Sequence, residues 1–306
     1  MTRRNGDLRQ AFVFGNAALD EVFLVRDMPS DNESVLGRAG RTGLGGKGAN
    51  QAIAIARTGL QTTFVAAIGT DWQGRAVREA LSREPLEAAL IEFPGLPTDR
   101  SVIFVQENGS NVIVTTNECA SRISIAECLS VLAQSRRGDA MLVQGNLRID
   151  VTSALCHECR RRGMFTVLNP SPFDTAFKDI LPLIDVLFVN ETEARRLTGL
   201  SSRDAVMALL RFGANQVVLT MGSEGSLLAS QHRVVHVPAV SADAVDVTGA
   251  GDCFEGVAVG SALLRGCPID ETAIRHASLA AAFAVESLGA ASAFPSPEQI
   301  AMLLGP

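Results

Sequence analysis

The residues of this chain best suited to chemistry lie in the segment Asp246-Val247-Thr248-Gly249-Ala250-Gly251-Asp252, which opens a long apolar stretch typical of a buried helix. Backbone N–H groups at the N-terminus of a helix bind anions, and the helix dipole adds positive potential there. We therefore expect Gly249, Ala250 and Gly251 to form an anion hole that stabilises a transferring phosphoryl group. Asp252 is then the candidate general base that takes the proton from an attacking hydroxyl. An acidic residue in the first turn of a helix also has an ordinary structural explanation, and that alternative stays open at this point.

A second glycine-rich segment, residues 42–51 (TGLGGKGANQ), contains elements of two phosphate-binding motifs. The P-loop is excluded, because Arg41 and Gly48 stand where that motif needs a glycine and a serine or threonine. A dinucleotide-binding turn matches on its three glycines, but residues 37–42, which would have to form its leading strand, make a poor buried strand.

What these glycines offer is a close approach of a ligand to the backbone at the start of a helix. The first turn of that helix carries Lys47, Asn50 and Gln51, whose polar side chains suit a polyhydroxylated ligand. A tight turn that only needs small residues is the alternative.

Two further polar segments follow strand-like runs. Asn190 and Glu193 come directly after the apolar run 186–189, and the carboxyl ends of parallel strands face the ligand crevice of an open α/β sheet. These two residues suit either the water shell of Mg²⁺ or a capping box for the next helix. Residues 220–225 (TMGSEG) end another apolar run and offer small residues and hydrogen-bond donors for phosphate oxygens.

Apolar runs alternate with amphipathic stretches from about residue 45 onward, which predicts an α/β fold with a mainly parallel sheet covered on both faces. We expect buried strands at residues 62–68, 140–144, 164–169, 186–189 and 216–220. A last helical block is expected from 250 to 287, with a break at 266–268. Capping boxes are predicted at Thr70 with Gln73 and at Ser124 with Glu127.

Residues 11–25 and 101–115 are β-rich without intervening helices, and 107–110 carries an Asn-Gly hairpin signal. We interpret parts of both stretches as a small separate sheet. The chain is then a single domain of 306 residues, with a lid formed by about 15–43 and 98–117 and an α/β core formed by the remainder.

Composition excludes several classes of partner. The net charge of -6 is spread along the chain without a basic stripe, which argues against a nucleic-acid partner. No window approaches the roughly 18 apolar residues of a spanning helix, so we expect a cytoplasmic protein without a membrane partner. The six cysteines are scattered and indicate buried thiols in a reducing compartment, and Cys156 and Cys159 are spaced as on one helix face.

Together these segments resemble the signatures of ribokinase-like carbohydrate kinases of the PfkB family. Residues 45–52 (GGKGANQA) are similar to the N-terminal signature of that family, and residues 246–252 (DVTGAGD) to its C-terminal signature. Asn190-x-x-Glu193 is similar to the magnesium motif and residues 220–225 to the phosphate loop. The order is also that of the family, and the resemblance covers nearly the whole chain.

The resemblance implies an α/β/α sandwich with a β-sheet lid, and transfer of a phosphoryl group from ATP with Mg²⁺ to a hydroxyl of a sugar or sugar derivative. It implies sugar contacts from Asp20, Gly45, Gly46, Lys47 and Asn50. It places ATP near Asn190, Thr220, Gly222 and Gly225, with the adenine near His276 and Ala277. It places Mg²⁺, through water, on Asn190 and Glu193, and a K⁺ ion on Asp246, Thr248 and residues 284–293. It also implies a homodimer formed through the lids.

Departures from the ribokinase pattern bear on the acceptor. Ala18 stands where ribokinases carry Asn, Asn146 stands where they carry Glu, and residues 117–120 replace a small turn. Lost hydrogen-bonding partners change discrimination strongly, so these differences disfavour ribose. Arg100, at the lid entrance, suits either an anionic sugar or solvent.

Three other functions are weighed against a sugar kinase. A nucleoside kinase of the same fold is the main alternative, because Gly15-Asn16-Ala17-x-x-Asp20 also resembles adenosine kinases, but a chain with no Tyr and one Trp offers few surfaces for stacking a base. A sugar-sensing pseudokinase would be expected to lack the base, and Asp252 is present. A dehydrogenase is the remote alternative.

Overall fold

The structure, a computed structural model, describes residues 9–106 and 111–305, so the hairpin predicted at 107–110 lies outside the described residues. Strands are β1 (Gln10–Phe14), β2 (Ala18–Val25), β3 (Gly37–Gly45), β4 (Gln61–Gly69), β5 (Glu87–Phe93), β6 (Arg100–Gln106), β7 (Asn111–Thr115), β8 (Ala140–Gln144), β9 (Phe165–Asn169), β10 (Val186–Asn190), β11 (Gln216–Thr220), β12 (Ser226–Ser230) and β13 (Arg233–Val237). Helices are α1 (Lys47–Arg57), α2 (Trp72–Leu81), α3 (Ile125–Leu132), α4 (Ile149–Arg162), α5 (Phe177–Ile180), α6 (Glu191–Thr198), α7 (Ser202–Arg211), α8 (Ala250–Arg265), α9 (Glu271–Val285) and α10 (Pro297–Leu304).

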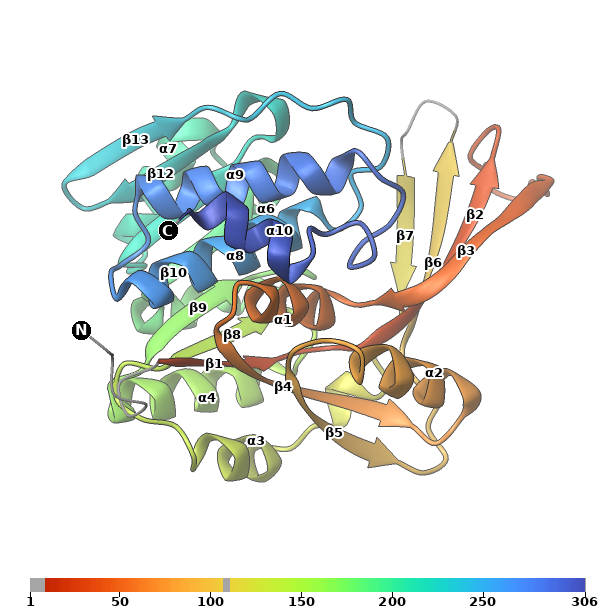
Figure 1. Cartoon of the computed structure of the whole chain (residues 1–306), viewed down its shortest axis with the longest axis horizontal. Coiled ribbons are helices and arrows are strands. Elements are labelled where there is room, and N and C mark those ends of the chain that lie inside the picture. The colour runs from red at the N-terminus through yellow and green to blue at the C-terminus, as the bar shows by residue number, and fades with distance from the viewer. Residues whose placement is uncertain (1–8, 107–110, 306) are drawn as a thin grey trace.

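A nine-stranded sheet in the order β13-β12-β11-β10-β9-β8-β1-β4-β5 forms the centre of the core (Figure 1). Every neighbouring pair from β11 to β5 is parallel, and only β12 and β13 add antiparallel pairs at one edge. The five buried strands predicted from the apolar runs are all present in this sheet, within one residue at each end. The predicted α/β class is thus confirmed.

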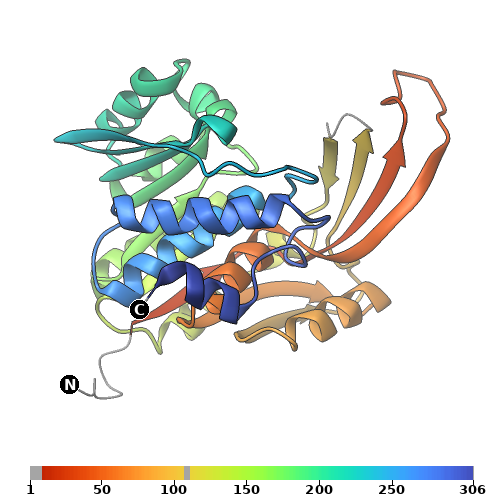
Figure 2. The same ribbon diagram turned by 45° about the horizontal axis from the view of Figure 1, so that its top comes forward.

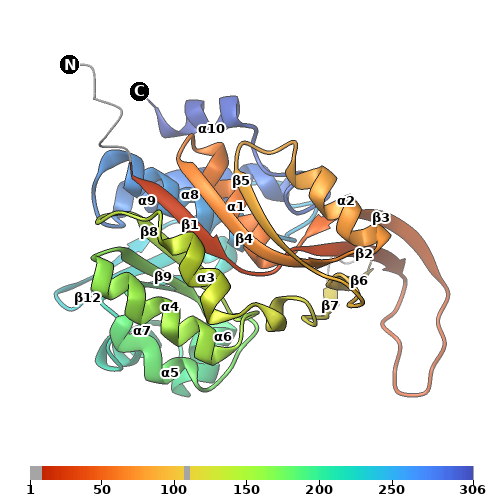
Figure 3. The same ribbon diagram turned by 90° about the horizontal axis from the view of Figure 1, so that it is seen from below.

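Helices cover both faces of this sheet, as Figure 3 shows from below. One buried apolar cluster joins one face of the strands to α1, α2, α8, α9 and α10, and a second joins the other face to α3, α4, α5, α6 and α7. The predicted final helical block is present as α8 and α9, and its break coincides with Gly266, which ends α8 in the left-handed conformation that glycine adopts readily.

A separate four-stranded sheet in the order β3-β2-β6-β7 extends to one side of the core (Figures 1 and 2). Its strand β3 begins at Gly37 and is mostly exposed, so the absence of a buried apolar pattern there reflects its place at a sheet edge. Strand β1 belongs to the large sheet and β2 to the small one, so the β-rich stretch 11–25 is divided between the two. The polypeptide runs from β3 directly into α1, which connects the small sheet to the core.

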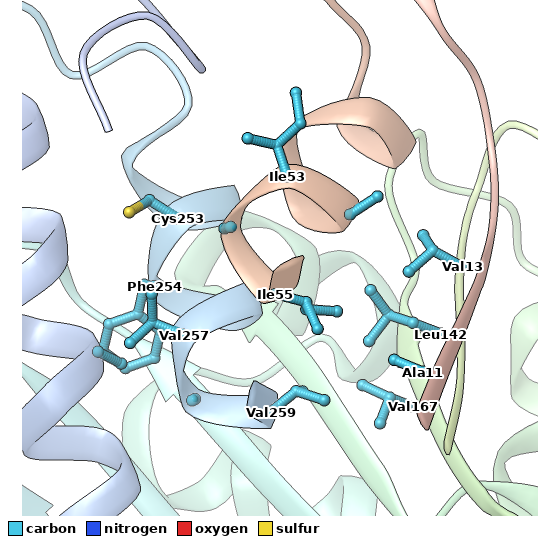
Figure 4. Packing of buried hydrophobic residues seen from close by; sticks show 14 of the residues in the cluster. Ala11, Val13, Ile53, Ile55, Leu142, Val167, Cys253, Phe254, Val257 and Val259 are labelled. Carbon is cyan, nitrogen blue, oxygen red and sulfur yellow. The ribbon is translucent and has the colours of Figure 1, made fainter. Parts of the chain in front are cut away.

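Helix α1 lies between α8 and the large sheet (Figure 4). Ile55 of α1 faces the strands near Leu142 and Val13, while Cys253 and Val257 lie on α8 (Figure 4). Helices α1 and α8 both begin at glycines with positive φ, and they pack closely against one another. This pair of helices brings the two glycine-rich segments together.

One of the two predicted capping boxes is formed, and so is the box given as the alternative for Asn190 and Glu193. The capping boxes of Ser124 and of Asn190 are both formed. The box predicted at Thr70 is wrong: Asp71 is the N-cap residue, and its carboxylate accepts the N–H groups of Gly74 and Thr98 at 2.8 Å each. An ionised carboxylate that can serve two donors is a better cap here than the preceding hydroxyl.

The structure bears on two expectations that were drawn from composition. Within residues 9–106 and 111–305, none of the helices is both long and apolar enough to cross a membrane. Five of the six cysteines are buried, and Cys156 and Cys159 lie on the inner face of α4, as their spacing predicts.

Candidate active site

Asp252 lies in the first turn of α8 and is held by side chains of α1. Its two carboxylate oxygens accept hydrogen bonds from Asn50 Nδ2 and Gln51 Nε2, each at 3.0 Å, although these residues are more than 200 positions away in the sequence. Asp252 is 6% exposed and Asn50 5% exposed. The carboxylate is therefore fixed in orientation, close to the surface and directly behind the glycines that start its helix.

The start of α8 leaves room for an anion. Gly249 has a φ of 77°, which turns the chain into the helix, and a Cβ on Gly251 would meet no atom within 4 Å. Ala250 N–H donates to the Val247 carbonyl at 3.2 Å. Of the three N–H groups predicted to bind the anion, that of Ala250 is therefore also used in the turn that precedes α8. The first N–H groups of a helix have no intrahelical acceptor, which leaves those not used in the turn available to an anion.

The glycines before α1 are required by close packing around Asp20 and Asn16. A Cβ on Gly45 would lie 2.0 Å from the Asp20 carboxylate, and one on Gly46 would lie 2.8 Å from the Asn16 carbonyl oxygen, at a φ of 94°. Burial raises the pKa of Asp20 to about 6, opposed by hydrogen bonding to Ser101 and by the charge of Arg41. One oxygen of this buried carboxylate has no hydrogen-bond partner in the described structure.

Three carboxylates surround Lys47 at the start of α1. The Lys47 ammonium lies 3.7 Å from the Asp252 carboxylate, and the charge of Asp252, with smaller contributions from Glu193 and Glu255, raises the pKa of Lys47. Burial raises the pKa of Glu255 well above its ordinary value, and the neighbouring Asp252 raises it further. Lys47, from the segment predicted to bind the sugar, therefore has a pKa that depends on the charge of the predicted general base, Asp252, and of the predicted magnesium residue, Glu193.

Asn190 and Glu193 form a capping box at the carboxyl end of β10. Asn190 Oδ1 accepts the Glu193 N–H at 2.9 Å, and Glu193 Oε2 accepts the Asn190 N–H at 2.9 Å. The capping role is thus formed, and a role in holding hydrated Mg²⁺ stays compatible with the structure, because Glu193 is also close enough to Lys47 to influence the pKa of that lysine. Thr220 is paired with Asn190 in the β10–β11 register, so the predicted phosphate loop begins beside this pair.

The predicted phosphate loop is a tight turn built on two glycines. Gly222 and Gly225 have φ values of 56° and 95°, and Met221 N–H donates to the Gly225 carbonyl at 2.8 Å. A Cβ on Gly225 would lie 2.2 Å from the Val237 carbonyl, whereas one on Gly222 would meet nothing within 4 Å. Gly225 is thus needed for packing, and Gly222 offers an open backbone surface.

Asp246 and Thr248 lie on the turn that leads into the anion hole. Asp246 Oδ1 accepts the Thr248 N–H at 2.9 Å, and Oδ2 accepts the Gly289 N–H at 2.9 Å. The guanidinium of Arg41, on strand β3, lies 3.4 Å from the same Oδ2. A positive charge of the protein itself therefore stands where the expected potassium ion would have to bind, and these residues do not fit that ion.

His276 and Ala277 lie on α9, apart from this cluster. His276 Nδ1 is 2.8 Å from Ser261 Oγ, and its pKa is lowered by burial and by the nearby charge of Arg265. Ser261 lies eleven residues after Ala250 in α8, which corresponds to roughly 16 Å along the helix axis. The structure does not bring His276 to the carboxylates, and Ala277 is fully buried in the core.

Two positions that bear on the acceptor have opposite environments. Asn146 is 3% exposed, and its side-chain oxygen has no partner in the described structure. Arg100 is about half exposed and lies 4.0 Å from Glu21, a weak surface pair. A cavity of about 410 Å³ lies beside Asp20, between β3 and residues 290–292.

Sequence reasoning missed the polar chain behind Asp252. Gln144 Nε2 donates to Gln51 Oε1 at 2.6 Å, and Gln51 Nε2 also donates to Glu255 Oε2 at 3.3 Å. All three side chains are almost fully buried. Glu255 could have been singled out from the sequence, because it is a carboxylate inside the apolar run CFEGVAVGSALL. Gln144 could not, because a polar residue at the end of a strand is ordinary and only the fold shows its contact with Gln51.

Comparison with known proteins agrees with the geometry. The model of the pfkB family carbohydrate kinases matches residues 9–297. The ribokinase of Haemophilus influenzae is 32% identical over 94% of this chain and 95% of its own length. Two solved structures are similar over 97% of this chain and 99% of theirs, each with a TM-score of 0.85: the ribokinase of Thermotoga maritima, 28% identical, and that of Arabidopsis thaliana complexed with ribose and ATP, 27% identical. The chain therefore belongs to the pfkB family of carbohydrate kinases, and the enzyme class expected from its sequence, an ATP-dependent carbohydrate kinase, is confirmed.

Proposed function

We propose that this kinase transfers the γ-phosphoryl group of ATP to a hydroxyl of a neutral sugar bound between the small sheet and α1, with Asp252 as the general base. The observation that carries the proposal is the pair of hydrogen bonds from Asn50 and Gln51 to the Asp252 carboxylate. They join the two glycine-rich segments into one site, with a base and an anion hole on the same helix turn. A base must lie within hydrogen-bond reach of its proton, and these two bonds fix the orientation of the carboxylate from which that reach starts.

The acceptor is expected to donate hydrogen bonds. Asp20 Oδ1, Asn50 Oδ1 and Asn146 Oδ1 are all buried without a partner in the described structure. The Nδ2 group of Asn50 is already used on Asp252, which leaves its oxygen as an acceptor. Buried acceptors without donors are costly, and sugar hydroxyls would satisfy them. A small sheet that closes over this pocket would act as its lid.

A pentose or hexose is favoured over a nucleoside. Phe23 and Phe104, the aromatic residues of the small sheet that could stack on a base, lie with ring centroids 6.0 Å apart and so pack against one another. The similar proteins named above are ribokinases. Ala18 and Asn146 depart from the ribokinase pattern, so we propose that the sugar differs from ribose at the hydroxyls these positions would meet.

The phosphate side of the site fits ATP with Mg²⁺. Glu193, at the carboxyl end of β10, supplies carboxylate oxygens of the kind Mg²⁺ prefers. Asn190 and Glu193 would hold the hydrated ion, which would neutralise charge on the phosphates. Thr220, Gly222 and Gly225 would bind the donor phosphates, while the backbone at Gly249–Gly251 would stabilise the transferring group.

A homodimer through the small sheets is part of this proposal. Strand β7 is an edge strand, and its Val112, Ile113 and Val114 are 48 to 60% exposed. Unpaired edge strands with exposed apolar side chains commonly pair with a second chain. Sedimentation of the purified protein measures this directly, and a monomer at micromolar concentration would contradict it.

The proposed reaction is tested by measuring consumption of Mg-ATP with pentoses, hexoses, sugar phosphates and nucleosides. Asp252→Asn should lower turnover on the active acceptor by orders of magnitude and change ATP affinity little, because the amide keeps the shape but cannot take the proton. Near-normal turnover in Asp252→Asn would remove the base assignment. A nucleoside as the best acceptor would contradict the proposed sugar.

A further inference from the structure

Arg41 connects the small sheet to the loop that precedes the anion hole. It lies on β3, and its Nη2 is 3.4 Å from Asp246 Oδ2 while its Nη1 is 3.1 Å from Ser292 Oγ. Asp246 and Ser292 are 205 and 251 residues away from it in the sequence. A planar guanidinium can serve two acceptors at once in fixed geometry, which a lysine could not reproduce.

The loop around Asp246 is shaped to receive this guanidinium. A Cβ on Gly289 would lie 1.8 Å from Arg41 Nη1, so only glycine leaves space for it. Gly289 has a φ of 127° and donates its N–H to the same Asp246 oxygen that faces Arg41. The carboxylate of Asp246 therefore has its positive partner and two backbone donors in place.

This loop is braced against the anion hole. The N–H groups of Val245 and Asp246 donate to the Val285 carbonyl at 2.7 and 3.1 Å. A Cβ on Gly249 would lie 3.0 Å from Ala290, so the segment after α9, which also carries Gly289, packs directly against the first glycine of the proposed anion hole. A change in the charge beside Asp246 is thus transmitted to the backbone that would stabilise the phosphoryl group.

We propose that Arg41 takes the place of a monovalent cation at Asp246, so that this kinase needs no K⁺ or Na⁺. The inference rests on the proposed function, in which the Gly249–Gly251 backbone binds the transferring phosphoryl group. Because Arg41 belongs to the small sheet, its cation reaches Asp246 only when that sheet lies against the core. Seating of the lid and order in the anion hole are thereby coupled through one side chain.

The test compares wild type, Arg41→Gln and Arg38→Gln in KCl, NaCl and tetramethylammonium chloride at equal ionic strength. Arg38 is a matched control, because it is an exposed arginine of the same strand for which the described residues offer no ion pair. Turnover on the active sugar and the thermal unfolding midpoint are both measured. The thermal measurement needs no substrate, so it tests the inference even if the enzyme does not catalyse the proposed reaction.

Wild type and Arg38→Gln should show the same turnover and the same midpoint in all three salts. Arg41→Gln should lose about tenfold or more in turnover in tetramethylammonium, the loss expected when a charged hydrogen-bond partner is removed. KCl should restore part of that turnover and raise its midpoint. Several-fold activation of wild type by K⁺, or a defect in Arg41→Gln that K⁺ neither restores nor stabilises, would overturn the proposal.

Discussion

Replacing Gly256 by alanine should separate α1 from α8 and displace Asp252, the proposed base. Gly256 lies one turn after Asp252, where α8 crosses α1, and a Cβ there would lie 2.5 Å from Ala54 Cβ and 2.8 Å from the Gln51 carbonyl oxygen. Ordinary contact begins at 3.4 Å, so the added methyl group is short of space by about 0.9 Å against Ala54. Because the atoms it meets are a Cβ and a helix backbone, rotation of a side chain cannot relieve the overlap.

The consequence for activity should exceed the consequence for stability. Overpacking costs about 1–3 kcal/mol, and alanine recovers about 1 kcal/mol over glycine within a helix, so the net loss of unfolding free energy is about 0–2 kcal/mol. The hydrogen bonds from Asn50 and Gln51 to Asp252 span the same pair of helices at 3.0 Å. A shift of about 0.9 Å would stretch them beyond hydrogen-bond range, and displacement of a catalytic group by about 1 Å costs on the order of 100-fold in rate.

Gly260→Ala is the matched comparison. Its Cβ would lie 2.4 Å from Thr58 Oγ1, just beyond the C-terminal end of α1 and one further turn from Asp252. Urea unfolding and kcat are measured for both variants. Gly260→Ala should lose stability and keep kcat within about threefold, since the donors of Asp252 are untouched. A Gly256→Ala enzyme with wild-type kcat would refute the claim that this helix contact sets the position of the base.

Two titratable groups give further predictions. Because the pKa of Asp20 is raised to about 6, its carboxylate is protonated as the pH falls through 6, so the KM for the sugar should rise between pH 7 and 5. In Asp20→Asn the KM should be about tenfold higher at pH 7 and independent of pH in this window; an unchanged pH profile would exclude Asp20 from sugar binding. Glu255, beside Asp252, Lys47 and Glu193, has its pKa raised well above its ordinary value, so the folded state holds its proton more tightly than the unfolded state, and stability from that proton is lost as the pH rises. Glu255→Gln should therefore keep kcat within about threefold and show a flatter dependence of the unfolding midpoint on pH above the ordinary glutamate value of 4.5, whereas equal pH dependence in both proteins would contradict this assignment.

The parts of the fold predicted correctly are those with short-range signals. The strands at 140–144 and 216–220 were predictable to the residue, because each is a short apolar run bounded by polar residues or glycine. Strand β3 (GRAGRTGLG) was not predicted as such, because it lies at an exposed edge and has no apolar alternation. Asp71 is a preferred N-cap residue and accepts the local Gly74 N–H, but Thr70 with Gln73 matches a capping box equally well in the sequence. The second donor to Asp71, Thr98, is brought near only by the fold.

The hydrogen-bond and ion-pair partners of the candidate site residues could not be predicted from short-range signals. Asn50 and Asp252 were recognisable singly by residue type and motif, yet their contact depends on the crossing of α1 and α8. The guanidinium at Asp246 could not be predicted, because nothing in the sequence around Arg41 marks its partner. The position of a charged residue with a distant partner, such as Arg41 beside Asp246, therefore bears on the expected potassium site in a way that the sequence alone does not reveal.

This division explains why the reaction was easier to infer than the sugar. The proposed base and anion hole lie within four consecutive residues at the start of a helix marked by glycine, so a short sequence motif is enough to predict them. The proposed acceptor pocket combines Asp20 from β2, Asn50 from α1 and Asn146 from beyond β8. Each supplies an oxygen without a partner in the described structure, and the direction of that oxygen depends on the relative placement of three elements. Small shifts among these elements would change which hydroxyls are matched without disturbing Asp252. Substitutions at Asp20 or Asn146 should accordingly change the KM ratio between sugars more than kcat, while substitutions at the α1–α8 contact should lower kcat for every sugar alike.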